Sequence, residues 1–87
     1  MLITCSRESL SEVGPRLAET DGVTEVYTTT GSFDYIAIVR VKDMEGLAEL
    51  VTERLGKIPG ISRTDTHVAL RAYSKQDMEA AFQIGVD

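Results

Sequence analysis

The residues with the clearest chemical potential form one short run, Thr30-Gly31-Ser32-Phe33-Asp34-Tyr35. Apolar, β-branched stretches flank this run, at residues 23–30 and 35–41, and a glycine in the gap between them is typical of a β-hairpin connection. Gly31 can adopt the positive φ that such a turn often requires. A carboxylate at Asp34, placed beside exposed backbone groups, can hold the ammonium group of a small zwitterion. The run therefore offers binding rather than catalysis.

Each of these residues also has a purely structural interpretation. Asp34 can accept hydrogen bonds from backbone N–H groups within a turn, and Thr64 and Thr66 are common strand residues whose hydroxyls need no ligand. His67 is the only histidine, and a zinc site would need three or four convergent ligands. Cys5 has no Cys-x-x-Cys partner and is expected to be a small buried hydrophobe. We predict no metal site and no cofactor.

Length and composition limit the classes of protein. The chain has 87 residues, which predicts one domain over residues 1–87. Its net charge is -5 without a basic cluster, which argues against nucleic-acid or membrane-surface binding. One cysteine cannot form an internal disulfide, which favours the cytoplasm. We find no Ser/His/Asp or Cys/His set and no glycine-rich phosphate loop, so no catalytic residues are predicted.

Hydrophobic periodicity predicts four strands, at residues 1–5, 23–30, 35–41 and 61–73. Between the first two strands, the spacing of apolar residues predicts a helix that ends at Asp21-Gly22. Pro15 favours a start capped by Ser11, which places the proline in the first turn, and an earlier start capped by Ser9 with a kink is the alternative. The apolar face of this helix comprises Leu10, Val13, Leu17 and Ala18.

Asp43 is expected to cap a second helix, which Pro59-Gly60 should stop sharply. Its apolar stripe comprises Leu47, Leu50, Val51, Leu55 and Ile58. Ser74 is expected to cap a short C-terminal helix with an apolar stripe of Met78, Ala81 and Phe82. A helix this short needs to dock on the domain or on a partner.

The resulting order, β-α-β-β-α-β, predicts an α+β, ferredoxin-like fold. Right-handed crossovers put the first and third strands at the centre of a four-stranded antiparallel sheet with both helices on one face. Residues 35–41 are apolar on both alternating sides, whereas a strand with one wet face should alternate. We therefore expect a second copy to cover the open side of the sheet, giving a dimeric αβ sandwich.

Several motifs occur in a defined order: Gly31-x-Phe33-Asp34-Tyr35, a helix, Ile58-Pro59-Gly60-Ile61, and Thr64-x-Thr66. This ordered set resembles the effector-binding domain of the Lrp/AsnC regulators, called RAM for regulation of amino-acid metabolism. The resemblance covers nearly the whole chain. Members usually carry an N-terminal helix-turn-helix that is not seen here, so the chain is similar to stand-alone RAM proteins and direct DNA binding is not implied.

The resemblance implies a homodimer formed through the sheets, with octamers built as tetramers of dimers. It also implies that an amino acid or similar metabolite binds between dimers, near the turn. The residues that match the family's effector site are Gly31, Phe33, Asp34, Thr64, Thr66, His67 and Val68.

Three functions follow as hypotheses. The first is an oligomeric regulatory domain that binds an amino-acid-like effector. The second is an assembly partner that co-oligomerises with full-length Lrp/AsnC regulators. The third, a small dimeric ferredoxin-like enzyme, lacks a defensible acid/base pair.

Overall fold

The computed structural model describes residues 1–73 and residue 75. Within them the chain forms a four-stranded sheet in the order β2-β3-β1-β4, and all three neighbouring pairs are antiparallel. This confirms the predicted topology, with the first and third strands at the centre. The elements are β1 (Leu2–Cys5), α1 (Leu10–Ala18), β2 (Val23–Thr28), β3 (Tyr35–Val39), α2 (Met44–Glu49) and β4 (Ile61–Asp65).

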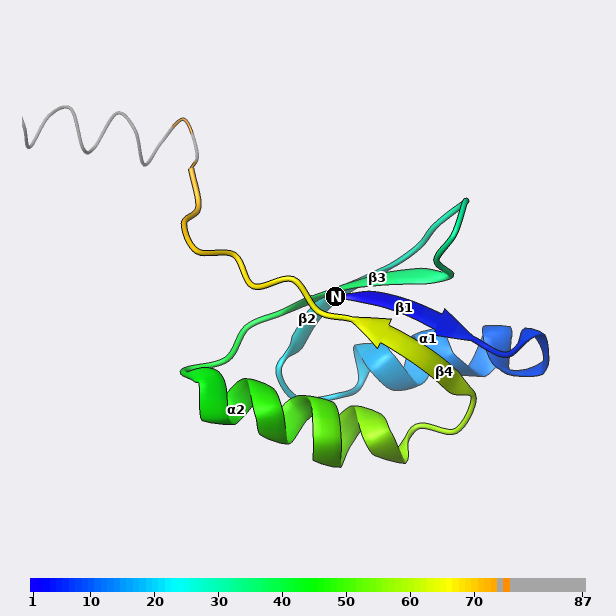
Figure 1. The fold of residues 1–87 in the computed structure, drawn as a ribbon. Coiled ribbons are helices and arrows are strands. Elements are labelled where there is room, and N and C mark those ends of the chain that lie inside the picture. The colour runs from blue at the N-terminus through cyan, green and yellow to red at the C-terminus, as the bar shows by residue number, and fades with distance from the viewer. Residues whose placement is uncertain (74, 76–87) are drawn as a thin grey trace, which may run out of the picture.

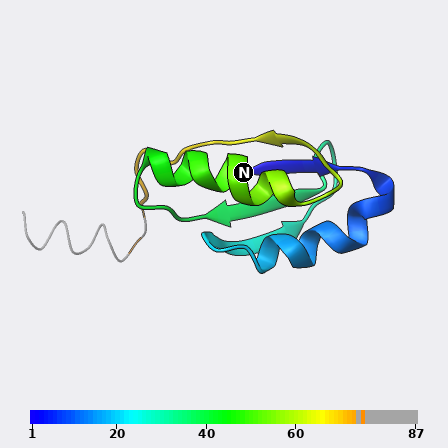
Figure 2. The same cartoon turned by 90° about the horizontal axis from the view of Figure 1, so that it is seen from below.

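Both helices lie on the same side of the sheet (Figures 1 and 2). Alternate residues of the central strands point to that side, where Ile3 and Ala37 are fully buried. From the helical layer, Val13, Leu17 and Leu50 reach the same core and are also fully buried. The hydrophobic core of the described residues therefore lies between one layer of helices and one face of the sheet.

The first helix begins earlier than the favoured prediction. A 3-10 turn (η1, Arg7–Ser9) leads directly into α1, Ser9 stands at the N-cap, and Pro15 lies inside the helix. The Ser11 cap is therefore wrong, and the earlier start is correct. The Ser9 side chain makes no capping hydrogen bond. Burial of Val13 and Leu17 stabilises this placement and outweighs the local cost of the proline.

The second helix begins as predicted but changes geometry along its length. The Asp43 carboxylate accepts a hydrogen bond of 2.8 Å from the amide of Gly46, which confirms the N-cap. After α2 come a π-helical stretch (η2, Leu50–Arg54) and a 3-10 turn (η3, Leu55–Lys57). Ile58 is extended before Pro59, as expected for a residue that precedes proline.

The strands are shorter than their sequence patterns. β2 and β3 end at Thr28 and Val39, and β4 ends at Asp65, eight residues before the predicted end at Tyr73. The last β4 residue paired with β1 is Asp65, which lies opposite Leu2. Beyond that pair β1 offers no further backbone partner, so residues 66–73 leave the sheet (Figure 1). The predicted C-terminal helix lies outside the described residues.

The side of the sheet away from the helices carries apolar side chains. Leu2 and Ile36 are half-buried there, and Ile38 and Tyr27 are 37% and 52% exposed. These four lie on β1, β3 and β2, and the β3 residues confirm that this strand is apolar on both sides. We call this surface the open face.

Two glycines with similar backbone angles allow a stability test. Gly60 has φ +98° and lies so close to Ser9 that an added Cβ would overlap both side-chain atoms of Ser9, whereas Gly31 has φ +106° and no other atom within 4 Å of such a Cβ. We expect Gly31→Ala to cost about 1–2 kcal/mol from backbone strain alone, and Gly60→Ala to cost a further ~1–3 kcal/mol from overpacking. Urea denaturation measures both. Equal losses would show that the Ser9 contact has no energetic weight.

Candidate functional site

The Asp34 carboxylate lies where β3 begins beside the end of β1. Its Oδ2 accepts a hydrogen bond of 2.8 Å from the backbone N–H of Cys5, and the Asp34 amide donates to the carbonyl of Ile3 at 2.9 Å. The side chain therefore joins two neighbouring central strands. This is the structural role that the sequence left open for Asp34. A carboxylate accepts several hydrogen bonds, so this contact does not use up its capacity.

The loop before Asp34 is closed by its own hydrogen bonds. The Thr29 amide donates to the Asp34 carbonyl at 3.1 Å, and the Thr29 hydroxyl donates to the Phe33 carbonyl at 2.6 Å. Gly31 is exposed at the tip with φ +106°, as predicted for this turn. The loop thus holds the Asp34 carboxylate at the ends of the two central strands, while the tip of the loop is exposed to solvent.

The Cys5 thiol is buried beside the same carboxylate. Burial raises the pKa of Cys5, and the nearby charge and hydrogen bonding of Asp34 raise that pKa further. A raised pKa keeps the thiol protonated at neutral pH and makes it a poor nucleophile. Cys5 therefore acts as the small buried hydrophobe that the sequence suggested.

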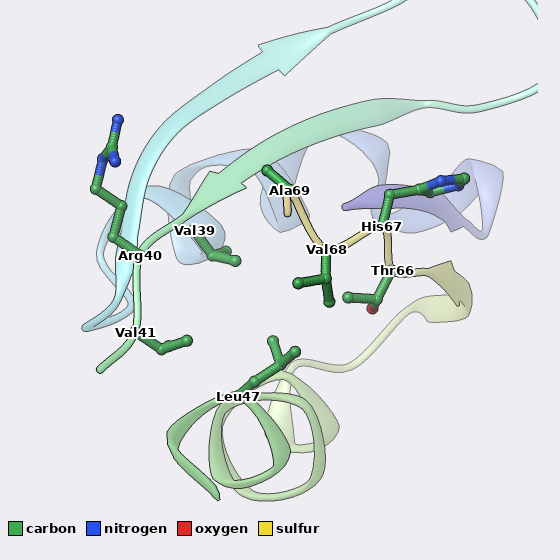
Figure 3. Close-up of a pocket in the computed structure, with 8 residues that line it drawn as sticks. All are labelled: Val39, Arg40, Val41, Leu47, Thr66, His67, Val68 and Ala69. Carbon is green, nitrogen blue, oxygen red and sulfur yellow. The ribbon is translucent and has the colours of Figure 1, made fainter. Parts of the chain in front are cut away.

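A groove of about 280 Å³ lies at the opposite end of β3. Figure 3 shows that Val39, Val41, Leu47, Thr66 and Val68 point into it from three segments: the end of β3, helix α2 and the chain after β4. Most of these side chains are apolar, and Thr66 adds a hydroxyl. The arrangement suits a small ligand with an apolar part.

The predicted site residues after β4 take two directions. Thr66 and Val68 point into the groove, whereas His67 lines its rim and points away from it (Figure 3). The His67 ring instead lies 3.4 Å from the Asp65 carboxylate, measured from Nε2 to Oδ1. This alternation follows from the extended backbone, in which successive side chains face opposite sides.

Thr64 lines a neighbouring hollow of about 210 Å³. Val51 and Leu55 of the helical layer and Ile61 of β4 also line it. Thr64 and Thr66 therefore share the helix-facing side of this part of the chain, each beside a separate hollow. The two threonines of the Thr-x-Thr motif face the same side because they are two residues apart in an extended segment.

The structure separates the predicted site residues into two groups within one copy. Gly31, Phe33 and Asp34 lie at the start of β3, whereas Thr66 and Val68 lie near its end. Five residues of strand separate Asp34 from Val39, which corresponds to about 17 Å at ~3.3 Å per residue. One small amino acid cannot span that distance within a single copy.

Sequence reasoning missed five of the residues that line the groove: Val39, Arg40, Val41, Leu47 and Ala69. Leu47 belongs to the predicted apolar stripe of the second helix, but it is only half-buried. Val41 is 39% exposed because β3 ends before it. An apolar residue just beyond the end of a strand is the signal that could have identified this position.

Two further properties concern the described residues only. Among residues 1–73, no three His, Cys, Asp or Glu side chains are grouped in a way that could hold a metal ion. Over the same part of the chain, no helix has the length and apolar character needed to cross a membrane.

Comparison with known proteins assigns the family. The model of the Lrp/AsnC ligand binding domain matches residues 1–78. The chain belongs to this family. Its members are regulatory ligand-binding domains of transcription regulators rather than enzymes, so the expectation of a non-enzymatic domain is confirmed. The resemblance drawn from the ordered motifs is also confirmed.

Individual relatives agree with this assignment. The crystal structure of TTHA0845 from Thermus thermophilus is 39% identical, with a TM-score of 0.80 over 85% of this chain and 92% of that chain. The structure of FFRP-DM1 is 29% identical, with a TM-score of 0.74 over 79% and 92% of the two chains. The HTH-type transcriptional regulator FL11 of Pyrococcus horikoshii is 32% identical over 75 residues, 86% of this chain and 49% of the regulator. The chain thus spans about half the length of the curated relatives it matches.

The hydrogen bond between Asp34 and Cys5 yields a stability prediction. Asp34→Ala leaves the partly buried Cys5 N–H without its acceptor and should cost about 1–3 kcal/mol. Asp34→Asn keeps an acceptor oxygen and should cost less. Asp21→Ala, which removes an exposed carboxylate, should change stability by less than about 0.5 kcal/mol. Urea denaturation compares the three variants, and an Asp34→Ala variant as stable as the wild type would refute a structural role for this bond.

Proposed function

We propose that this domain binds a small amino-acid-like metabolite at a site shared between copies of the chain. Residues 1–87 act as one such regulatory domain, in the cytoplasm. The observation that carries this proposal is the separation of the two groups of site residues. Asp34 and the groove lie at opposite ends of β3, so one ligand meets both only where two copies adjoin.

The groove supplies the part of the site that recognises the side chain. Leu47, Val39 and Val68 form an apolar surface, and the groove lies at the small end of the range of ligand pockets. The Thr66 hydroxyl and nearby backbone groups provide hydrogen bonds for a carboxylate. This combination favours an amino acid with an apolar side chain over a large or strongly charged metabolite.

Asp34 of a neighbouring copy supplies the charge for the ammonium group. Its carboxylate already accepts the Cys5 N–H, which fixes its orientation before a ligand arrives. A preorganised acceptor loses less conformational entropy on binding. A charge-assisted hydrogen bond of this kind contributes about 1.5–3 kcal/mol, so its loss should weaken binding by roughly 10- to 150-fold.

Self-association through the open face supports this arrangement. Tyr27 and Ile38 are exposed there on neighbouring strands, and the helices cover only the other side of the sheet. A second copy of the same sheet would remove these side chains from water, giving a homodimer. Further pairing of dimers, up to an octamer, would create additional junctions where Asp34 approaches a groove.

A panel of the twenty amino acids tests ligand binding. We expect at least one to stabilise the protein against thermal unfolding, by about 2.7 kcal/mol at a concentration 100-fold above its dissociation constant. Asp34→Asn and Val68→Asp should each weaken this effect. Leu70→Asp is the matched control, because Leu70 is 96% exposed and lies outside the groove lining. Absence of stabilisation by all twenty would contradict the proposal.

Co-expression of the two defective variants tests whether the site is shared. A mixed dimer of Asp34→Asn and Val68→Asp copies has one site with both defects and one with neither, so about one quarter of all sites should regain full affinity after random pairing. Titration calorimetry counts these sites. If Asp34 and Val68 act within one copy, mixing restores none, and the shared site is refuted while ligand binding stands.

A second candidate function is co-assembly with full-length Lrp/AsnC regulators. It is favoured by the match of this chain to about half of HTH-type regulators such as FL11, because the shared half is the domain through which copies would associate. Mixing the chain with such a regulator and measuring mass by light scattering separates the two candidates. Mixed oligomers that form without any amino acid would support co-assembly, and separate populations would exclude it.

A further inference from the structure

The groove lies on the line of β1, beyond the residue at which that strand starts. β1 runs between β3 and β4, and its pairing with β3 ends where the backbones of Met1 and Ala37 exchange two hydrogen bonds of 2.9 Å. Past this pair the groove has residues 39–41 on one side and residues 66–69 on the other (Figure 3). It is therefore an interval in the sheet as well as a hollow between side chains.

Main chain forms much of the two groove walls. Each wall is a run of consecutive residues, whereas side chains alone would contribute only alternate residues of an extended chain, because successive side chains face opposite sides. Two strands that flank a shared neighbour lie about 9.6 Å apart, which is twice the usual spacing of ~4.8 Å. The interval therefore has the width of one extended chain.

The backbone of Val39 faces this interval. Alternate residues of a strand direct their N–H and C=O groups to the same side, and Ala37, two residues earlier, directs its groups to Met1. The opposite side of β3 is paired with the β2 region, where the Arg40 amide donates to the Gly22 carbonyl at 2.8 Å. Within the described residues no strand pairs with Val39 on the interval side. A strand edge of this kind can take up an added extended chain.

The same alternation determines where the side chains of an added chain would point. Met1, Ile3 and Cys5 are buried toward the helices along the line of β1. The next position outward on this line therefore faces the open face, and the one after it faces the helices beside Val39. Leu47 lies on that helical side of the groove and is half-buried. The second position outward is thus the one that suits an apolar side chain.

We propose that the groove binds a short peptide as a continuation of β1, running in the same direction, with a dipeptide as the preferred length. The first residue of the dipeptide pairs its backbone with Val39 and places an apolar side chain beside Leu47. The second residue turns its side chain to the open face, and its N–H faces the chain that follows β4. This inference rests on the ligand binding of the proposed function and names the class of ligand.

The direction of the peptide agrees with the shared site. A chain that continues β1 has its carboxylate at the inner end of the groove and its ammonium at the outer end. The ammonium is then on the residue whose side chain contacts Leu47, and it projects from the copy that holds the peptide. That is the placement which Asp34 of a neighbouring copy requires in the proposed function.

A free amino acid fills only part of the interval. Its main chain covers one residue, about 3.3 Å, whereas each wall has at least three consecutive residues. A dipeptide adds a peptide N–H that can pair with the second wall, and one such hydrogen bond raises affinity by roughly 2- to 12-fold. Free amino acids are therefore the smallest and weakest members of the class.

Titration calorimetry of the full chain with four ligands tests main-chain recognition. We expect Leu-Gly to bind about 2- to 12-fold more tightly than leucine. Gly-Leu should bind about tenfold more weakly than Leu-Gly, because its leucine side chain is turned away from the groove. Leu-Gly methylated on its peptide nitrogen should bind no better than leucine, because it lacks the N–H that pairs with the second wall.

Two variants of the second helix separate the side-chain contact from the main-chain contacts. Leu47→Ala should remove most of the preference for Leu-Gly over Ala-Gly and keep the preference for Ala-Gly over alanine. Met44→Ala is the matched control, because Met44 lies on the same helix, is 67% exposed and does not line the groove. It should keep both preferences.

The outcomes distinguish this inference from the proposed function. Leucine or the N-methylated peptide binding as tightly as Leu-Gly overturns main-chain recognition and leaves amino-acid binding intact. Equal affinities for Gly-Leu and Leu-Gly overturn the direction of the bound peptide and with it the continuation of β1. Absence of binding by leucine and by every peptide overturns this inference and the proposed function together.

Discussion

The placement of β1 between β3 and β4 is the constraint on which the rest of the domain depends. β1 contributes only four residues, from Leu2 to Cys5; β4 pairs with it along that length, and β3 pairs with it at Leu2 and Ile3. At one end of this pairing, Asp34 accepts the Cys5 amide and holds the β2–β3 loop against the sheet. At the other end the Met1 carbonyl accepts a hydrogen bond of 2.9 Å from the Ala37 amide. Beyond this point no strand lies between β3 and the chain that follows β4. The groove lies in this interval, with Leu47 beneath it.

The topology could be predicted from the sequence because the alternation of apolar residues along the strands corresponds to the two faces of the sheet. Ile3 and Ala37 face the helices, while Ile36 and Ile38 face away, as the two-sided apolar pattern of β3 requires. The ends of the strands could not be predicted in the same way. A strand ends where its neighbour ends, and residues 66–73 have strand-like composition but no partner within one copy beyond Leu2. Composition reports what a segment can form, whereas pairing decides what it forms.

Local signals were also outweighed by packing in the helices. Pro15 suggested a later start for α1, but the helix that buries Val13 and Leu17 needs the earlier one. Nothing in the periodicity of residues 44–57 indicated the change to π-helical geometry at Leu50. For the site, the sequence indicated which residue types could bind a ligand but not how they are arranged in space. Asp34 was identified as a binding carboxylate or a structural acceptor, and its bond to Cys5 is compatible with both.

In the proposed shared site, Asp34 and the groove belong to different copies, and this arrangement couples ligand binding to assembly. A site that lies within one copy gains no binding energy from assembly, so its ligand cannot shift the association equilibrium. A site that needs two copies binds its ligand only in the assembled state, and the ligand must then stabilise that state by mass action. In the proposed assembly the open face contributes apolar contacts between copies, while the groove and Asp34 add a contribution that depends on the ligand. His67 points away from the groove and Val68 points into it, so adjacent residues of this extended segment face opposite sides.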